Sequence, residues 1–296
     1  MQLTVLVTGS SGLIGRKTVA KLLNDGYNIV SLQRSDLDMA GVKHLKFDAF
    51  EDDWESIIPE LKEINAIVHL GGFIDKGVNE FQRDLIRKVN IGYSNNLIDF
   101  ALSNGVSRFV FASTLSFTKV PLPSMIFENS EVEPTTFYSE SKKIIEDRLM
   151  ECNINLSLSA SILRISSPIS DNLSEMHNTV VKQWLEKARR GETLQVFGSG
   201  KRSQDFIDTG DIADAISLCL KSRAKGVFNI ASGNTISMID LAKRISTKYG
   251  VDYEFIEGPL SDELIWQISI GKAKSELGFL PKYTSQENII KLLNKL

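Results

Sequence analysis

A tyrosine and a lysine lie four residues apart, a spacing that can place the two side chains together for proton transfer. Tyr138 and Lys142 lie in the segment FYSESKKIIEDRL, whose pattern predicts a helix over about 138–152, so their side chains share one helical face. A lysine ammonium beside a phenol favours the phenolate and lowers the tyrosine pKa from its usual value of about 10. The tyrosine then becomes a general acid or base near neutral pH. The same spacing is also common on solvated helix faces.

Hydroxyl groups follow the predicted strand in VSRFVFAST. Either Thr114 or Ser113 offers a hydroxyl that can hydrogen-bond the oxygen of a reacting substrate. Open α/β sheets bind ligands at the carboxyl ends of their strands, so we expect other residues at this edge to contact a ligand. Those that follow the strands VKHLKF and NAIVH are Asp48, Ala49, Leu70, Gly71 and Gly72.

A glycine-rich turn lies near the start of the chain, in VTGSSGLIG. Gly9, Gly12 and Gly15 separate a predicted strand over about 3–7 from a predicted helix over about 12–24. Glycines there allow a tight bend and a close approach of the backbone to a ligand, and the N–H groups of the helix start suit a dinucleotide pyrophosphate. The alternative is a flexible loop that happens to be rich in glycine.

The second predicted strand, YNIVSLQR, ends where such folds contact the adenosine ribose. NAD-binding proteins usually carry an acidic residue there, whereas this chain has Gln33, Arg34 and Ser35. A guanidinium suits a 2′-phosphate, which favours NADP over NAD. The alternative is that Arg34 is an ordinary solvated residue.

Alternating strands and helices predict the fold class, which is α/β with a Rossmann-type, doubly wound parallel sheet. The strands are continuous apolar runs, as in a sheet covered by helices on both faces. Helical patterns fill the intervals at about 54–62, 80–104 and 138–152.

The bulk composition is that of an ordinary globular protein. Of its 296 residues, 42% are hydrophobic and 24% are charged, and the net charge of −3 argues against binding to nucleic acid or to a membrane surface. No apolar run is long enough to span a membrane and no secretory leader is evident, so we expect a cytoplasmic protein. Cys152 and Cys219 have no metal-ligand spacing, which predicts buried thiols and no metal site.

Several motifs together resemble the extended branch of the short-chain dehydrogenase/reductase family. TGSSGLIG (Thr8–Gly15) fits TGxxGxxG, and HLGG (His69–Gly72) is similar to HLAA. VNIGYSNNLIDFA resembles VNxxGTxNLLEAA and places Asn90 as a supporting polar residue. GSGKRSQDFIDTGDIADAI (Gly198–Ile216) is similar to GxGxxxRDFxxVxDVAxAI, and LGFLP resembles LGWxP. The resemblance runs from about residue 3 to about residue 290.

The resemblance implies roles for residues at the matching positions. Tyr138 would be the acid/base, Lys142 would tune its pKa and bind the nicotinamide ribose, and Thr114 would donate to the substrate oxygen. The cofactor, NADP or NAD, would be bound by residues from the motifs above, namely Gly9, Ser11, Gly12, Leu13, Ile14, Gly15, Arg34, Asp48, Ala49, Leu70, Gly71, Gly72, Asn90, Ser113, Tyr138 and Lys142.

The resemblance also implies a nucleotide-diphosphate sugar as substrate, with two departures from the family pattern. The arginine that commonly binds the diphosphate is Gln204 here, so Lys201 or Arg202 would supply the missing charge, unless both are loop charges in water. Where the family's 4,6-dehydratases carry Asp-Glu, this chain has Leu115 and Ser116, which argues against dehydration.

Two net reactions and one non-enzymatic role remain open at this level. The first is epimerisation, expected at C4 of the sugar, and the second is reduction of a keto sugar by NADPH. The third is a nicotinamide-binding regulatory protein without turnover, which is disfavoured because Tyr138, Lys142 and Thr114 are all present.

The chain is expected to form two lobes. Residues 1–165 and about 205–235 would form the dinucleotide-binding domain, and about 166–204 and 236–296 a smaller, discontinuous substrate-binding lobe. The proline-dotted segment 118–140 is predicted to be a loop over the active site. In the extended branch, two helices matching 80–104 and 138–152 usually pair across a dimer, so the resemblance implies a homodimer.

Overall fold

A parallel β-sheet forms the centre of the larger lobe. The computed structural model describes residues 2–36, 39–74, 79–120, 122–155, 158–176, 179–258 and 264–296. Within these residues seven strands form one sheet, in the order β11-β6-β5-β4-β1-β2-β3, and every neighbouring pair is parallel. Their bounds are β1 Thr4–Thr8, β2 Asn28–Gln33, β3 Val42–Lys46, β4 Ala66–His69, β5 Arg108–Thr114, β6 Ser159–Ile165 and β11 Gly226–Ile230.

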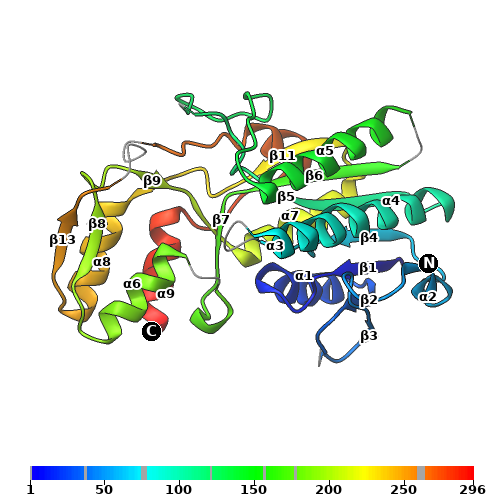
Figure 1. The fold of residues 1–296 in the computed structure, drawn as a ribbon, viewed down its shortest axis with the longest axis horizontal. Coiled ribbons are helices and arrows are strands. Elements are labelled where there is room, and N and C mark those ends of the chain that lie inside the picture. The colour runs from blue at the N-terminus through cyan, green and yellow to red at the C-terminus, as the bar shows by residue number, and fades with distance from the viewer. Residues whose placement is uncertain are drawn as a thin grey trace.

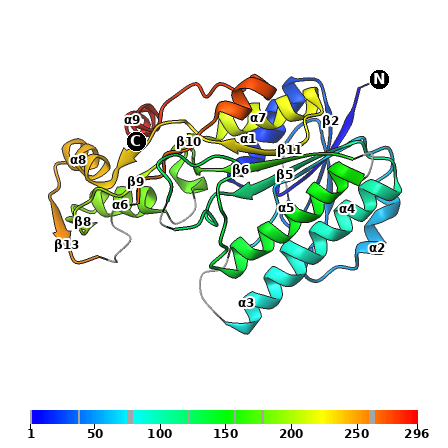
Figure 2. The same cartoon turned by 90° about the horizontal axis from the view of Figure 1, so that it is seen from above.

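Helices cover both faces of this sheet (Figure 2). On one face lie α1 (Leu13–Asn24) and α7 (Thr209–Ser222), and on the other lie α2 (Trp54–Ile57), α4 (Tyr93–Ser103) and α5 (Phe137–Asn155). Successive strand residues point to opposite faces, so each strand feeds two apolar cores. Burial on both faces explains why the strands are continuous apolar runs, and the predicted Rossmann-type fold is confirmed.

The predicted helix over 80–104 is interrupted. It consists of α3 (Glu80–Leu85), a π-helical segment (Ile86–Gly92) and α4, which follow one another without a break. The predicted helix over 54–62 is likewise α2 followed by a 3₁₀ turn (Ile58–Glu60). A π-helical segment places one extra residue in a turn and occurs often at functional sites. Here it contains the candidate residue Asn90.

The smaller lobe lies beside the sheet and has its own apolar core (Figure 1). In the described ranges, three two-stranded pairings lie outside the large sheet, namely β7–β10, β9–β12 and β8–β13. Their bounds are β7 Ser167–Ile169, β8 Leu194–Phe197, β9 Ser203–Gln204, β10 Phe206–Asp208, β12 Ile236–Ser237 and β13 Tyr253–Ile256. The helices around this core are α6 (Val180–Arg189), α8 (Met238–Tyr249) and α9 (Ser285–Lys295).

A buried carboxylate joins the two lobes where the chain crosses between them. Asp205 accepts hydrogen bonds from the Ser166 hydroxyl at 2.8 Å and from the Ser232 backbone N–H and hydroxyl, each at 2.9 Å. Ser166 directly follows β6 and Ser232 comes two residues after β11. Burial raises the pKa of Asp205, although these hydrogen bonds favour the carboxylate. The three crossing segments are therefore tied at one point.

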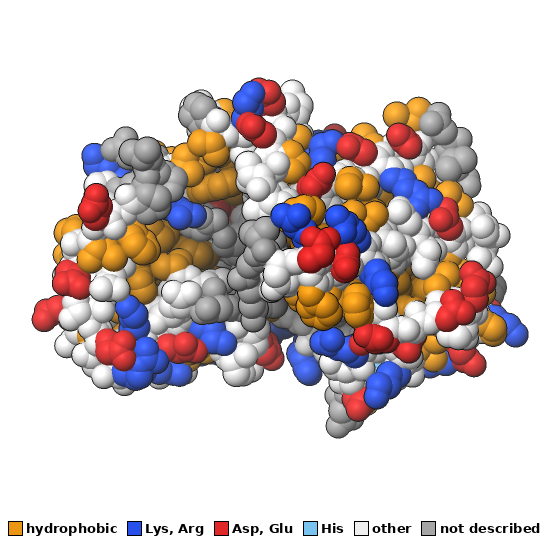
Figure 3. Space-filling model, viewed as in Figure 1, with side chains coloured by type: hydrophobic (Ala, Val, Ile, Leu, Met, Phe, Trp, Pro, Cys, Tyr) orange, Lys and Arg blue, Asp and Glu red, His pale blue; other side chains and the backbone are white. Residues whose placement is uncertain are grey.

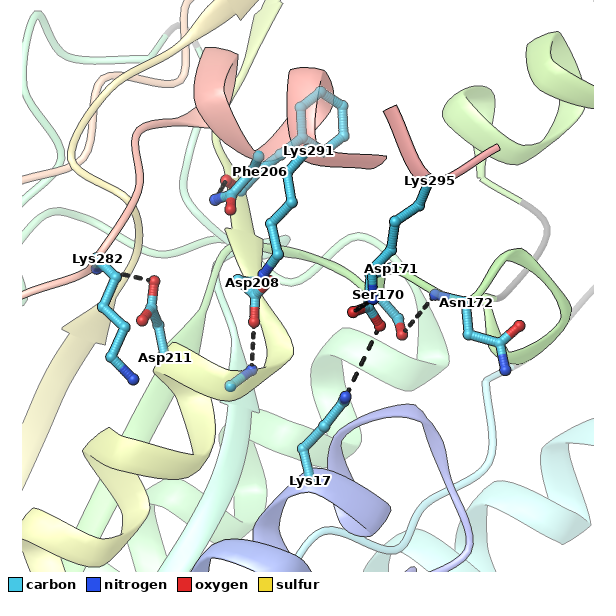
Figure 4. A network of polar contacts seen from close by, with 12 residues as sticks. Lys17, Ser170, Asp171, Asn172, Phe206, Asp208, Asp211, Lys282, Lys291 and Lys295 are labelled. Carbon is cyan, nitrogen blue, oxygen red and sulfur yellow. Dashed lines mark hydrogen bonds and ion pairs between the residues drawn. The ribbon is translucent and has the colours of Figure 1, made fainter. Parts of the chain in front are cut away.

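Two lysines of α9 form ion pairs near the junction of the two lobes (Figure 4). Lys291 contacts Asp208, the N-cap of α7, at 2.7 Å, and Lys295 contacts Asp171. Asp171 also lies 3.7 Å from Lys17 of α1. The apolar residues of α9 pack into the core of the smaller lobe. The apolar face of α9 thus packs into the smaller lobe, while its lysines pair with Asp208 at the start of α7 and with Asp171 beside α1.

The described part of the chain shows neither a membrane-spanning helix nor a metal cluster. No helix in these ranges has both the length and the apolar content that a membrane span needs. Among the same residues, no group of three or more His, Cys, Asp or Glu side chains could hold a metal ion. Cys152 and Cys219 are both free and buried, as their sequence context predicts.

Asp25 is expected to stabilise the packing of α1 against α7. Partial burial by itself raises the pKa of this carboxyl, but hydrogen bonds from Lys21, Ser217 and Lys221 outweigh that effect and lower the pKa to about 2. Asp25→Asn should therefore lower the free energy of unfolding by about 2 kcal/mol at pH 7. Because the folded-state pKa is depressed, this stabilisation is present above about pH 4 and is lost as the pH falls toward 2.

Urea denaturation at pH 7 and at pH 3 measures this difference. Glu131→Gln is the matched control, because its ion pair with Lys119 is exposed and should not contribute measurably. An Asp25→Asn variant whose deficit is the same at both pH values would contradict the assignment.

Candidate active site and cofactor cradle

The turn after β1 approaches the turn after β4 without any side chain between them. Gly9 has φ +67°, and a Cβ atom there would lie 2.7 Å from the backbone nitrogen of Gly71. A Cβ atom at Gly15 would lie only 2.1 Å from the carbonyl oxygen of Gly9. Both positions therefore require glycine, for two different steric reasons. The result is a bare backbone surface at the N-terminus of α1, formed by Gly9, Gly15 and Gly71. We call this surface the glycine cradle, and it fits a dinucleotide pyrophosphate.

The buried side chain of Gln33 stabilises the glycine-rich turn after β1. The side-chain oxygen of Gln33 accepts hydrogen bonds from the Ser11 backbone N–H at 2.6 Å and from the Ser10 hydroxyl at 2.7 Å. The Gln33 amide nitrogen donates to the Ser35 carbonyl at 2.8 Å. Gln33 is 8% exposed, so its side chain is committed to holding the turn. The sequence alone did not reveal this role, because a polar residue at a strand end has no distinctive pattern.

Two guanidinium groups flank the turn. Arg34 follows β2 with its side chain 77% exposed, and its Nε lies 4.0 Å from a carboxylate oxygen of Asp48. Arg16, in the first turn of α1, donates from Nε to the Ser11 carbonyl at 3.1 Å. Sequence reasoning missed Arg16, although its position directly after Gly15 was a usable signal.

Four other residues that the sequence predicts as cofactor contacts lie near the turn, and the structure shows where their side chains pack. Leu13 is buried and reaches the core of the smaller lobe, whereas Ile14 packs on the α1 face of the sheet. Asp48 accepts a hydrogen bond from the Phe50 backbone N–H at 3.0 Å, and Ala49 packs beside the α4 and α5 core.

Asn90 connects the turn after β4 with α5. Its side-chain oxygen accepts from the Phe73 backbone N–H at 2.7 Å, and its amide nitrogen donates to the Phe73 carbonyl at 2.9 Å. The same nitrogen donates to the Ser141 hydroxyl at 3.1 Å, and that hydroxyl donates to the Tyr138 carbonyl at 2.7 Å. Asn90 therefore joins the cradle to the helical turn that carries Tyr138 and Lys142. Ser141, which completes this link, was not singled out in the sequence.

His69 is part of the scaffold. Its Nδ1 lies 2.6 Å from the Thr8 hydroxyl oxygen, and its Nε2 lies 2.8 Å from the hydroxyl oxygen of Ser94. Burial, assisted by the charge of Lys142, lowers the pKa of His69 to about 3. The ring is therefore neutral at physiological pH and ties β1, β4 and α4 together.

Lys142 extends along α5 to the end of β5. Its Nζ donates a hydrogen bond to the Ala112 carbonyl at 2.9 Å and lies 5.8 Å from the centroid of the Tyr138 ring. Lys142 is 5% exposed. Burial lowers its pKa to about 8, while the nearby carboxylate of Glu146 opposes the shift. The amine thus titrates close to neutral pH.

The predicted direction of the Tyr138 pKa is wrong for the protein without cofactor. The side chain is of intermediate exposure, and desolvation by the surrounding protein raises its pKa to about 12. The reason is that Lys142 donates to a backbone carbonyl and is itself desolvated, so its charge does not offset the burial of the phenol.

Ser113 and Thr114 are the last two residues of β5, and their hydroxyl groups differ in their surroundings. Thr114 Oγ1 donates to the Ser116 hydroxyl and accepts from the Ser116 backbone N–H, both at 3.1 Å, and the residue remains half-buried. Ser113 is buried, and its hydroxyl has no hydrogen-bond partner among the described residues. An orphaned hydroxyl beside a glycine cradle is the arrangement expected where a polar ligand completes the site. The residues present therefore fit a nicotinamide dinucleotide.

The predicted substrate residues lie in the smaller lobe. Gln204 is in β9 and donates from its amide nitrogen to the Ser167 hydroxyl at 2.6 Å. Lys201 and Arg202 precede β9 at exposed positions. The surface is hollowed between the two lobes (Figure 3). These three residues and the Tyr138 turn therefore come from different lobes.

The fold and this site together define a dinucleotide-binding enzyme with a Rossmann-type sheet. Residues 5–231 match the model of the NAD dependent epimerase/dehydratase family. The chain belongs to this family, and is accordingly an NAD(P)-dependent enzyme of the extended short-chain dehydrogenase/reductase type.

Individual relatives are distant but span the chain. UDP-glucose 4-epimerase of Bacillus subtilis is 28% identical over 96% of this chain and 94% of its own length. UDP-glucuronic acid decarboxylase 4 of Arabidopsis thaliana is 25% identical over 97% of this chain, which spans 67% of that protein. The structure of UDP-glucose 4-epimerase from Thermotoga maritima has the same fold, with a TM-score of 0.85, 23% identity, and coverage of 99% of this chain and 98% of that one.

Gly15→Ala is expected to abolish the cradle. The added methyl group would lie 2.1 Å from the Gly9 carbonyl oxygen, so the turn must move and the affinity for NADH or NADPH should fall at least about tenfold. Nicotinamide fluorescence titration measures the affinity. Gly92→Ala is the control, because its Cβ would make an ordinary contact of 3.5 Å and should leave binding unchanged. Unchanged binding by Gly15→Ala would show that the cofactor does not use this turn.

Proposed function

We propose that this protein is an NAD(P)-dependent nucleotide-sugar epimerase acting at C4 of the sugar. The observation that carries the proposal is the connection of Tyr138 and Lys142, through Ser141 and Asn90, to the glycine cradle. Proton-handling residues and a dinucleotide site then share one rigid scaffold. UDP-glucose 4-epimerases are among the relatives, beside UDP-glucuronic acid decarboxylases, and they support epimerisation as one reaction of this site.

In the proposed mechanism Tyr138 takes the proton of the sugar hydroxyl and later returns it. Bound nicotinamide supplies the hydride acceptor and donor for the same carbon. Thr114 donates a hydrogen bond to the reacting oxygen, and the Lys142 ammonium favours the phenolate of Tyr138.

The residues after Thr114 argue against a dehydratase. Leu115 is 4% exposed and packs in a small apolar cluster, while Ser116 hydrogen-bonds Thr114. Neither offers the acid and base that elimination of water requires. A ketoreductase is the second candidate. It is favoured by Arg34 and Arg16, which flank the turn and would suit a dissociable NADPH.

The substrate would lie in the hollow between the lobes. We assign residues 1–165 and about 205–235 to the dinucleotide-binding domain, and about 166–204 and 236–296 to the substrate-binding lobe. Lys201 and Arg202 would supply positive charge for the substrate diphosphate. Gln204 is hydrogen-bonded to Ser167 and would line the same hollow between the lobes.

The proposal is tested on the purified protein in two steps. Mild denaturation releases any bound nucleotide for mass spectrometry, and near-stoichiometric NAD or NADP is expected for an epimerase that retains its cofactor. Incubation with UDP-galactose should then give UDP-glucose without net consumption of cofactor. An empty protein that consumes NADPH stoichiometrically would replace the epimerase by the ketoreductase.

Tyr138→Phe is expected to lower turnover by about a hundredfold or more while leaving cofactor affinity unchanged. The ring is retained, and only the proton-handling hydroxyl is lost. Chromatographic detection of the product sugar nucleotide measures turnover, and fluorescence titration measures affinity. Tyr283→Phe, in the C-terminal segment, serves as the control. Full turnover by Tyr138→Phe would remove this residue from the mechanism.

Arg34→Ala is expected to weaken NADPH binding about tenfold and to leave NADH binding unchanged, because only NADPH carries the 2′-phosphate. Parallel fluorescence titrations with the two cofactors measure both affinities. Arg190→Ala, an exposed site after α6, provides a charge-matched control. An equal loss for both cofactors would contradict a role of Arg34 in selecting NADP.

We also propose a homodimer formed through α4 and α5. The outward side of this helical layer carries apolar residues, including Ile144 of α5, which is 41% exposed, and Phe81 of α3, which is 63% exposed. Light scattering should give twice the 33.0 kDa of one chain, and Ile144→Glu should give the monomer mass. Ile290→Glu, at a site 39% exposed on α9, is the matched control. A monomeric wild-type protein would end this proposal.

A further inference from the structure

A buried ion pair lies one helical turn beyond Lys142. Glu146 of α5 and Arg164 of β6 have side chains that are only 2% and 8% exposed. The Nη2 of Arg164 donates to Oε2 of Glu146 at 2.8 Å, and its Nε lies 3.1 and 3.2 Å from the two carboxylate oxygens. The pair therefore uses two donors on one edge of the guanidinium, which fixes the relative orientation of the two groups.

Stability alone does not account for such a pair. Moving two charges out of water costs about as much as their attraction returns, and an apolar pair of the same size is often equally stable. Leaving either charge alone in the core is, in contrast, strongly unfavourable. The question is then what the Glu146–Arg164 pair holds in place.

Arg164 has a third contact, which reaches the segment between β5 and α5. Its Nη1 donates to the carbonyl oxygen of Glu128 at 2.9 Å, and its Cζ lies 5.0 Å from the centroid of the Phe117 ring. Phe117 follows Thr114 by three residues, and Glu128 lies farther along the same segment. One guanidinium thus joins the helix of Tyr138, strand β6 and the segment that leaves Thr114.

The same segment is held from the other side by Asn229 of β11. The Asn229 backbone N–H donates to the Glu128 carboxylate at 3.0 Å, and its side-chain nitrogen donates to the carbonyl oxygens of Ile126 and Ser269, each at 3.2 Å. Glu128 is therefore held by its carbonyl through Arg164 and by its carboxylate through Asn229. The segment after Thr114 is anchored to the two strands at this edge of the sheet.

The ion pair also determines the charge that faces Lys142. Besides Glu146 on its own helix, groups that face the Lys142 ammonium include the Ala112 carbonyl and the Phe111 ring of β5, the phenol of Tyr138 and neutral His69 of β4. Among the described residues, Glu146 is the carboxylate whose charge acts on Lys142, and it favours the protonated amine. Arg164 fixes the orientation of that carboxylate.

We propose that Glu146 and Arg164 are positioning residues of the active site. Arg164 orients the Glu146 carboxylate near Lys142 and anchors the segment that follows Thr114. The hydroxyl groups of Thr114 and Tyr138 and the amine of Lys142 are thereby held around the same reacting group of the substrate. The proposal rests on the proposed function to the extent that these three residues handle the substrate hydroxyl. Neither Glu146 nor Arg164 is expected to touch substrate or cofactor.

Three variants of the full-length protein test the proposal, with Asp147→Asn as the control. Glu146→Gln removes the negative charge at constant shape. Arg164→Met removes all hydrogen-bond donors of the side chain, and Arg164→Lys keeps the positive charge but loses the planar guanidinium and its paired donors. Asp147 follows Glu146 directly but forms an exposed pair with Lys143. Hydrogen exchange of the amides in 115–133 measures anchoring without any substrate. The pH dependence of hydride transfer from UDP-galactose measures the electrostatic effect.

Amide exchange in 115–133 should be at least about tenfold faster in Arg164→Met and intermediate in Arg164→Lys. Glu146→Gln should lower kcat more than it raises KM, and should move the alkaline limb of the pH profile downward by about one pH unit, because Lys142 loses the charge that favours its protonated form. Asp147→Asn should behave like the wild type in both measurements.

Wild-type exchange in Arg164→Met or Arg164→Lys, together with a wild-type pH profile in Glu146→Gln, would overturn the proposal. If Arg164→Met does not fold, the two conservative variants decide the question. A wild-type protein that transfers no hydride from UDP-galactose contradicts the proposed function but leaves the exchange experiment intact. The two failures are therefore distinguishable.

Discussion

The contact between the turn after β1 and the turn after β4 is the constraint on which the site depends. Gly9 and Gly71 approach so closely that a single Cβ atom would clash with backbone. The Thr8 hydroxyl accepts a hydrogen bond from the Gly71 N–H at 3.2 Å and also bonds His69. Since β1 and β4 are neighbouring parallel strands, their ends bring the start of α1 and the Asn90 network to one place. Cofactor cradle and proton-transfer residues thus share one support.

Buried polar groups are concentrated around this support, and each is compensated in a different way. Lys142 is bonded to a backbone carbonyl, His69 is neutral between two hydroxyls, and Glu146 is paired with Arg164. Asp205 achieves the same at the junction of the lobes with serine hydroxyls and backbone N–H groups. Burying such groups costs free energy unless they are hydrogen-bonded, so their partners restrict the geometry of the whole region.

Much of the fold could be predicted from local pattern, whereas several features of the site could not. Apolar runs and glycine positions indicated the strands and the turn of Gly9, because both depend on residues that are near in sequence. The π-helical segment around Asn90 and the supporting role of Gln33 depend on contacts with Phe73 and Ser11, which are distant in the chain. The direction of the Tyr138 pKa was predicted wrongly, because helical spacing reveals a neighbouring charge but not desolvation.

The sequence by itself determined the class of protein, since its motifs combine a fold pattern with side chains of defined chemistry over most of the chain. It also determined that Tyr138 and Lys142 share a helical face, because that follows from the helical repeat alone. Only the tertiary structure decided which groups are desolvated, which partner each buried charge has, and how Arg164 connects three elements. Those properties arise from atoms that are brought together by packing, and no local pattern encodes them.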